Sequence, residues 1–304
     1  LSVMIPVSGV LTRLDDRLVD ACERVDVFPG TEDVAIDPGT GMVFVSAADR
    51  RAAFAGAPVQ GGIFTFPLND TASVVKVSPD TFGDFQPHGI SLWRSAEGAQ
   101  RLFAINHPIA GGDTVEIFDI APDGSLTHVR TVAFEQMHSP NDVVAVGPEQ
   151  FYATNDKGFE GGIMEQVEAY LALPFSDIVY FDGAEGSVAA PGLVYANGVN
   201  TSLDGSTLYV AEFLKRRVKA YARDADSGAL THQRTYRLGT NPDNIDVASD
   251  GALWIGAHPR VFEFLKHVDD PAAVAPSQVV RLDPSNGEYA DMFIDTKGKL
   301  NGSS

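Results

Sequence analysis

Short apolar stretches separated by polar turns recur along the chain as hairpin-like units. Each unit opens with polar residues, continues as an apolar strand, passes through a turn rich in Pro, Gly or Asp, and returns as a second apolar strand. The first strands of the five units cover 32–37, 88–92, 141–146, 197–200 and 244–247. The units therefore begin roughly 50 residues apart, and a repeat of this length predicts a repetitive β architecture.

Two further strand-like stretches follow each hairpin. The third strands are expected at 63–66, 115–118, 178–181, 218–221 and 279–282, and outer strands at 74–77, 127–132 and 231–238. Four short antiparallel strands per repeat are typical of the blades of a β-propeller. Helical periodicity is nearly confined to Ile163–Leu173, which we expect to interrupt the third blade and to cover one face.

A sixth unit begins at 301–303, where the sequence stops. Because proteins avoid open sheet edges, we expect the segment 1–20 to supply closing strands and part of the sixth blade to lie outside this sequence. The apolar start of that segment can also be interpreted as the remnant of an anchor or signal. The prediction is an all-β, six-bladed β-propeller in a single domain, 1–304, with its sixth blade incomplete at the C-terminus.

Composition and charge narrow the class of protein further. The chain has 304 residues, is 44% hydrophobic and carries a formal charge of −19, which argues against nucleic acids and anionic membranes as partners. No apolar run approaches the ~20 residues that a transmembrane helix needs. Cys22 is the single cysteine, so no disulfide can form within this sequence.

The starts of the five first strands carry the candidate chemistry. The first strand of a propeller blade lines the central channel, so its polar residues converge on the axis. Buried amides cost about 1–3 kcal/mol unless they are bonded, and calcium satisfies such groups because it takes 6–8 oxygen ligands. The predicted ligands of this calcium are Glu32, Asn141, Asn197, Asp243 and Asn244. Zinc is disfavoured because it prefers nitrogen and sulfur. The alternative is that these residues cap strand ends or bond one another.

A second calcium and a group of histidines complete the set of candidates. Asp33 and Asp142 each follow a predicted ligand, and we expect them to share a second, buried ion with the Ile90 carbonyl. His88 opens the second unit and His107 follows its second strand; calcium rarely takes imidazole, so a general base is the favoured role. His258 lies at the equivalent strand end of the fifth unit.

Several segments together resemble the paraoxonase/arylesterase family, in order from about Cys22 to the end of the chain. They are GTEDVAID, FQPHGIS, INHP, NDVVAVGPEQFYATND, ANGVN, DNIDV and LWIGAHP. The resemblance implies a six-bladed propeller with two calcium ions in a central tunnel, held by the two ligand groups named above. It also implies a histidine dyad at His88 and His107, and the hydrolysis of lactones, with aryl esters and organophosphate triesters as side activities. Tyr195, Phe54 and His258 are expected to contact the small-molecule lactone or ester substrate.

The sequence also departs from the family pattern. Family members pair the cysteine that matches Cys22 with a cysteine in a further C-terminal segment, and this sequence stops before that segment. Substrate preference is therefore open, and a hydrophobic N-terminal anchor is not carried over. A sugar-lactone hydrolase or phosphotriesterase on a related propeller, or a calcium-stabilised scaffold without activity, remain the alternatives. Calcium at millimolar concentration favours a secreted or periplasmic protein, whereas the oligomeric state is not encoded in any motif.

Overall fold

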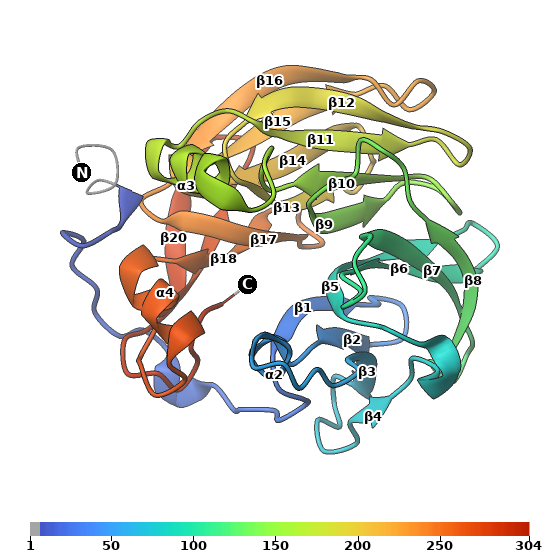
Figure 1. Ribbon diagram of the computed structural model, residues 1–304, viewed down its shortest axis with the longest axis horizontal. Helices are drawn as coiled ribbons and strands as arrows, with labels where there is room; N and C mark the ends of the chain where they lie inside the picture. Colours follow the sequence, from blue (N-terminus) through green and yellow to red (C-terminus); the bar gives the residue numbers. More distant parts are fainter. Residues whose placement is uncertain (1–6, 304) are drawn as a thin grey trace. The chain divides into compact units, whose positions relative to one another are not determined.

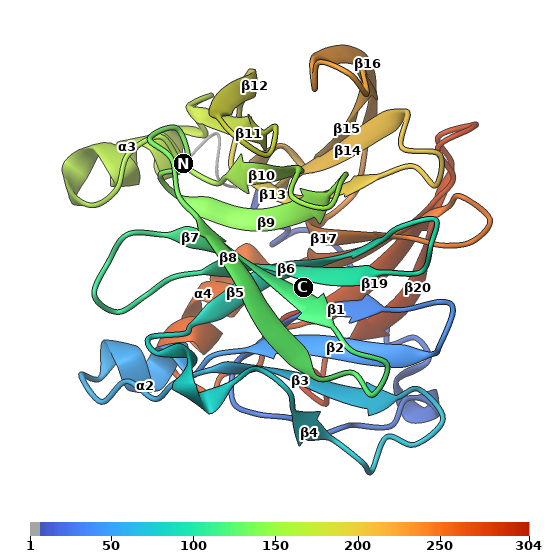
Figure 2. The same cartoon turned by 90° about the vertical axis from the view of Figure 1, so that its right-hand side faces the viewer.

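Five antiparallel sheets make up most of the computed structural model, which describes residues 7–303. Each sheet has four strands that follow one another in chain order, as Figure 1 shows. The first sheet contains β1 (Thr31–Ile36), β2 (Met42–Ala47), β3 (Gly62–Pro67) and β4 (Val75–Lys76). The second contains β5 (Pro87–Arg94), β6 (Gln100–Asn106), β7 (Thr114–Ile120) and β8 (Leu126–Val132). Figure 2 shows β1 to β4 side by side.

The other three sheets repeat this plan. The third contains β9 (Pro140–Ala145), β10 (Phe151–Asn155), β11 (Ser176–Phe181) and β12 (Gly186–Leu193). The fourth contains β13 (Ala196–Thr201), β14 (Thr207–Glu212), β15 (Arg217–Arg223) and β16 (Leu230–Arg237). The fifth contains β17 (Asn241–Val247), β18 (Leu253–His258), β19 (Ser277–Leu282) and β20 (Tyr289–Asp295). Such four-stranded meanders are propeller blades, and the prediction of an all-β propeller is confirmed.

Helical segments are short and lie between strands. They are η1 (Val19–Ala21), α2 (Arg50–Phe54), η2 (Asp80–Phe82), α3 (Gly162–Leu171), η3 (Phe213–Lys215) and α4 (Val261–Asp269). The helix α3 separates β10 from β11, as the helical period predicts. The sequence analysis missed α4, although Phe262, Leu265 and Val268 recur at helical spacing there. Within residues 7–303, no helix is long and apolar enough to span a bilayer.

The prediction of a sixth blade is wrong for the described residues, which form five. The residues expected to open it lie against the fifth sheet instead. The Ser303 hydroxyl accepts a hydrogen bond from the Gln278 amide (3.1 Å) and donates to the Ala257 carbonyl (3.0 Å), while the Ala275 amide donates to Asn301 Oδ1 (2.9 Å). These contacts bind 301–303 to β18 and β19, so an Asn-Gly-Ser run that resembles a blade start does not begin a strand here.

The chain separates into two compact units. One comprises 7–24, Thr154–Ile178 and 188–303, and the other Val25–Ala153 and Val179–Ser187. The prediction for 1–20 falls partly on 1–6, which lie outside the described residues. Of the remainder, Arg17 and Ile294 exchange two backbone hydrogen bonds of 2.8 and 3.1 Å, a single bridge to β20. One domain over 1–304 stays a prediction.

Apolar side chains pack between neighbouring sheets. Phe103 and Ile105 of the second sheet are fully buried in a cluster with Phe151 of the third sheet. The residues that alternate with them, Leu102 and Ala104, are equally buried in a cluster with residues of the first sheet, so the two faces of the strand contribute to two cores. This packing fixes the register of the strands, and it therefore fixes which residues stand at the start of each first strand.

Candidate active site

The first strands share a β-bulge at the position where the candidate ligands stand. Between Thr31 and Val34 the first strand advances three residues while its partner advances two, from Ala47 to Val45. Equivalent shifts occur in β5, β13 and β17. The residues inside these four bulges are Glu32-Asp33, His88-Gly89, Asn197-Gly198 and Asp243-Asn244. Bulges re-aim side chains and are frequent beside active sites.

In the unit that contains β1, β5 and β9, His88 lies among several polar groups. Its Nε2 is 3.6 Å from Glu32 Oε1 and 3.5 Å from Asn141 Nδ2, and its Nδ1 is 2.7 Å from Arg50 Nη2. Burial, then the positive charge of Arg50, then His107 hold the pKa of His88 well below its ordinary value. His88 is therefore a neutral imidazole, as proton transfer near neutral pH requires.

His107 lies beside His88 and is oriented by a carboxylate. The two rings are 5.1 Å apart between centroids, at an interplanar angle of 79°. His107 Nδ1 is 2.9 Å from Asp113 Oδ1, and a carboxylate accepts from the ring N–H. The structure thus brings together the two histidines of the predicted dyad, and it adds Asp113.

The two carboxylates predicted for a second calcium stand at the starts of first strands, Asp33 in the bulge of β1 and Asp142 in β9. Asp33 Oδ2 accepts from the Ile90 amide at 2.7 Å, and Asp142 Oδ1 accepts from the Val143 amide at 2.7 Å. Asp142 is buried. The Ile90 amide, whose carbonyl was the predicted ligand, therefore already links β5 to Asp33 on β1.

Two glycines let neighbouring first strands approach closely. A Cβ on Gly89 would lie 2.5 Å from Asp142 Oδ1 and 2.8 Å from the Asn141 carbonyl. In the other unit, a Cβ on Gly198 would lie 2.4 Å from the Asp243 carbonyl and 2.6 Å from Asn244 Cα. Only glycine fits at such distances, so the start of one first strand packs directly on the start of the next.

Oxygen atoms at the starts of the first strands fit a hard cation. Asn141 Oδ1 in one unit and Asn197 Oδ1 in the other are buried without a hydrogen-bond partner among residues 7–303. An unsatisfied buried acceptor costs about 1–3 kcal/mol, and a cation that takes oxygen ligands would satisfy it. No three His, Cys, Asp or Glu side chains among the described residues group as a metal site. Three of the five predicted ligands of the catalytic calcium are instead asparagines.

In the unit that contains β13 and β17, a histidine supports the predicted ligand Asp243. His258 Nε2 lies 2.6 Å from Asp243 Oδ2, and His258 is 2% exposed. Its ring packs on Phe264 of α4 at 3.9 Å and on Phe213 at 5.8 Å between centroids. This packing fixes the ring, which in turn orients one carboxylate oxygen of Asp243.

Comparisons with known proteins identify the family of this chain. The arylesterase family model matches residues 25–294. The chain belongs to the arylesterase family. Serum paraoxonase/arylesterase 2 of Gallus gallus is 38% identical over 261 residues, which cover 83% of this chain and 72% of that protein.

Solved structures show how widely the arylesterase fold is shared. A gluconolactonase from Xanthomonas campestris matches with a TM-score of 0.57 at 17% identity, over 90% of this chain and 78% of that one. The calcium-binding regucalcin from Agrobacterium tumefaciens matches with a TM-score of 0.51 at 13% identity, over 88% and 75%. At these identities the likeness concerns the fold alone.

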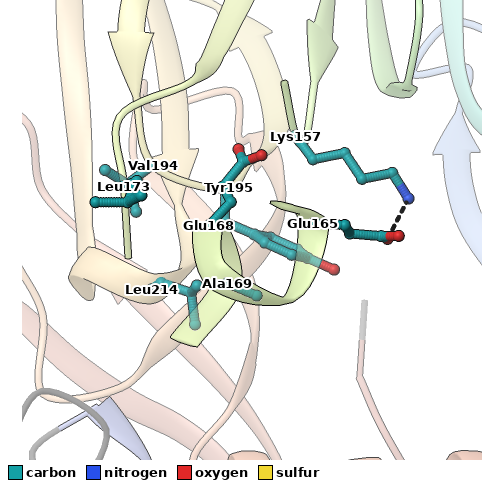
Figure 3. A pocket seen from close by; sticks show the side chains of 8 residues that line it. All are labelled: Lys157, Glu165, Glu168, Ala169, Leu173, Val194, Tyr195 and Leu214. Carbon is teal, nitrogen blue, oxygen red and sulfur yellow. Dashed lines mark hydrogen bonds and ion pairs between the residues drawn. The ribbon is translucent and has the colours of Figure 1, made fainter. Parts of the chain in front are cut away.

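Tyr195, one of the predicted substrate contacts, lines a pocket in this arylesterase. The pocket measures ≈150 Å³ and lies between α3 and the loop before β13. In Figure 3 the Lys157 ammonium, 3.0 Å from Glu165 Oε1, stands at one side of the Tyr195 ring. Burial, then the charges of Asp156, Asp243 and Glu165 raise the pKa of Tyr195, so its hydroxyl stays protonated.

The other predicted substrate contacts are not among the residues that line that pocket. Phe54 is the last residue of α2 and is 80% exposed, whereas His258 is buried against Asp243. Sequence reasoning missed Arg50 and Asp113, because neither stands at a repeat start or in a family segment.

Proposed function

We propose that this protein is a calcium-dependent hydrolase that opens lactones, with aryl esters and phosphotriesters as further substrates. Membership of the arylesterase family supports the class of reaction. The observation that carries the proposal is the pair of buried amide oxygens, Asn141 Oδ1 and Asn197 Oδ1, that have no partner among the described residues. Their position at the starts of first strands is the one predicted for calcium.

The ligands of the catalytic calcium are proposed to be Glu32, Asn141, Asn197, Asp243 and Asn244. Two carboxylates and three amides form an oxygen-only set that suits calcium and leaves coordination positions for water and substrate. When bound, the ion would polarise the carbonyl of the substrate and stabilise the negative charge that develops on its oxygen. A second, structural calcium is proposed at Asp33, Asp142 and the Ile90 carbonyl.

The protein side chains orient the ligands and move the proton. His258 holds Asp243 in one orientation through the 2.6 Å hydrogen bond. His88, assisted by His107, takes the proton that the attacking water releases, as a neutral imidazole can. Tyr195 and its apolar neighbours around the pocket are proposed to contact the alkyl or aryl part of the substrate. The dependence on calcium favours a secreted or periplasmic location.

A lactone panel measured with and without calcium tests this proposal. We expect turnover with calcium, loss after chelation and recovery when calcium is restored. His88→Gln should lower kcat about 10²–10⁴-fold, the typical contribution of a general base. His232→Gln is the matched control, because His232 is exposed and bonds only Thr235 in the same strand.

Two results would contradict the proposal. Activity that survives complete chelation would exclude a catalytic calcium. Calcium binding without turnover of any lactone, aryl ester or phosphotriester would instead favour a calcium-stabilised scaffold.

A further inference from the structure

Thr154 lies beside the bulge that carries the proposed calcium ligand Asn197. It belongs to β10 and is fully buried. Its hydroxyl donates a hydrogen bond to the backbone carbonyl of Asn197 at 2.7 Å. Both residues belong to the same compact unit. Thr154 is not among the predicted site residues, and nothing in the proposed function uses it.

The bulge interrupts the ladder of β13 at this carbonyl. Pairing with β14 is regular at Ala196 and Glu212 and resumes at Val199 and Val210, so Asn197 stands in the interrupted part. Backbone hydrogen bonds between strands are disrupted at a bulge, whereas a buried carbonyl needs a donor. The hydroxyl on β10, a strand of a different sheet, supplies a donor there.

A second contact holds the same bulge. Gly198 lies so close to β17 that a Cβ on it would be 2.4 Å from the Asp243 carbonyl. The bulge is therefore held against β17 at Gly198 and bonded to β10 through Thr154. Oδ1 of Asn197, in contrast, has no hydrogen-bond partner among the described residues. The backbone contacts, rather than a hydrogen bond to that oxygen, thus determine where it lies.

The end of β10 is itself held by buried hydrogen bonds. Asn155 Nδ2 donates to Asp177 Oδ1 at 2.7 Å, and the Ser176 hydroxyl donates to the Asp156 carbonyl at 2.7 Å. Asn155 and Ser176 are fully buried. These bonds join the end of β10 to the start of β11, and a shift of Thr154 would break them at a cost. Thr154 is therefore a fixed support for the bulge.

We propose that Thr154 is a positioning residue for calcium binding, whose hydroxyl keeps the backbone of Asn197, and with it the ligand oxygen Oδ1, in one position. This inference rests on the proposed function, which makes Asn197 a ligand of the catalytic calcium. Groups that hold a metal ligand in place typically contribute about 10–100-fold to metal affinity. Loss of the Thr154 hydroxyl should therefore weaken calcium binding to that extent.

Calorimetric titration of chelated protein with calcium compares three variants with the wild type. Thr154→Val keeps the shape of the side chain and removes the hydroxyl, and we expect its calcium affinity to fall about 10–100-fold. Thr154→Ser retains the hydroxyl and should keep most of the wild-type affinity. Thr65→Val is the matched control, because the buried Thr65 hydroxyl also donates to a strand carbonyl at 2.7 Å, that of Val43, where the ladder has no bulge. It should lower the midpoint of chemical denaturation as Thr154→Val does, but it should bind calcium with wild-type affinity.

A double-mutant cycle shows whether Thr154 acts through Asn197. If the hydroxyl positions the Asn197 side chain, Thr154→Val should cause little further loss of affinity once Asn197→Ala has removed the ligand oxygen. If Thr154 contributes only to the general stability of the fold, the two fold-losses should multiply, and the proposed role would be wrong.

Other outcomes would also overturn the role of Thr154. These are an unchanged calcium affinity in folded Thr154→Val, or an equal loss of affinity in Thr65→Val. If Thr154→Val does not fold, Thr154→Ala and Thr154→Ser make the same comparison, because these two variants differ only in the hydroxyl, and equal calcium affinities for them would refute the role. A wild type that binds no calcium would instead refute the proposed function, and this inference with it.

Discussion

Removing the hydrogen-bond donor from Asp243 is expected to destabilise the protein strongly. His258→Leu keeps most of the side-chain volume but leaves the carboxylate of Asp243 without its 2.6 Å partner. The His258 side chain is 3% exposed and that of Asp243 11% exposed, so water replaces the lost bond poorly. Leaving a buried group without its hydrogen-bond partner costs about 1–3 kcal/mol, and more for a carboxylate, so we expect a loss of about 3 kcal/mol in the free energy of unfolding here.

Chemical denaturation in the presence of a chelator measures this cost without a contribution from bound calcium. His258→Gln should recover part of the loss, because its amide can donate to the same carboxylate. His232→Leu, at an exposed histidine, should change the free energy of unfolding by no more than about 0.5 kcal/mol. If His258→Leu costs no more than His232→Leu, the pair does not support Asp243 and the reasoning is wrong.

Three further predictions concern single sites. Gly198→Ala places a Cβ 2.4 Å from the Asp243 carbonyl; we expect a loss of about 1–3 kcal/mol and weaker calcium binding, measured by denaturation and calorimetry. Glu116 is a buried carboxylate that accepts hydrogen bonds from two threonine hydroxyls and one histidine. Glu116→Gln should lower the free energy of unfolding by a similar amount but leave the calcium affinity unchanged, which calorimetric titration of the folded variant with calcium measures. Hydrogen bonds from Lys297 and from the adjacent threonine lower the pKa of Asp16 to about 2. The contribution of Asp16 to the free energy of unfolding is therefore present above about pH 4 and is lost as the pH falls through about 2. Asp16→Asn should be less stable than the wild type at pH 7, and the difference should vanish in acid. Chemical denaturation at both pH values measures it.

The blades could be predicted from the sequence because their signal is local. Short apolar runs and the turn residues between them are encoded within about ten neighbouring positions, and the run that contains Phe103 is fully buried in the structure. The sixth blade was predicted from three residues, 301–303, whose side chains have better partners on β18 and β19. A short motif cannot show whether its strand has neighbours.

The candidate site was predictable only where the repeat places it. Glu32, His88, Asn197 and Asp243 stand at the same position of four sequence repeats, and in each repeat that position is the bulge of the first strand. The bulge itself was not predicted, because it is visible only when two strands are paired. The hydrogen bond between His258 and Asp243 follows from the pairing of Asn241 with His258 across β17 and β18, so a predicted hairpin register could have found it.

Arg50 and Asp113 could not be predicted in the same way. Both lie outside the regular strands, Arg50 in α2 and Asp113 in the loop between β6 and β7, where no periodicity relates position to function. Their contacts with His88 and His107 depend on how those segments fold back on the second blade. Such contacts require the tertiary structure.

Calorimetric titration of chelated protein with calcium tests the central claim most directly. We predict saturable binding to the wild type and a loss of at least about 10-fold in affinity in Asn197→Ala, which removes a buried oxygen that has no other partner among the described residues. Asn286→Ala, in an exposed turn, should bind calcium as the wild type does. A wild type that binds no calcium, or an Asn197→Ala variant that binds it with unchanged affinity, would contradict the assignment of these first strands as a calcium site.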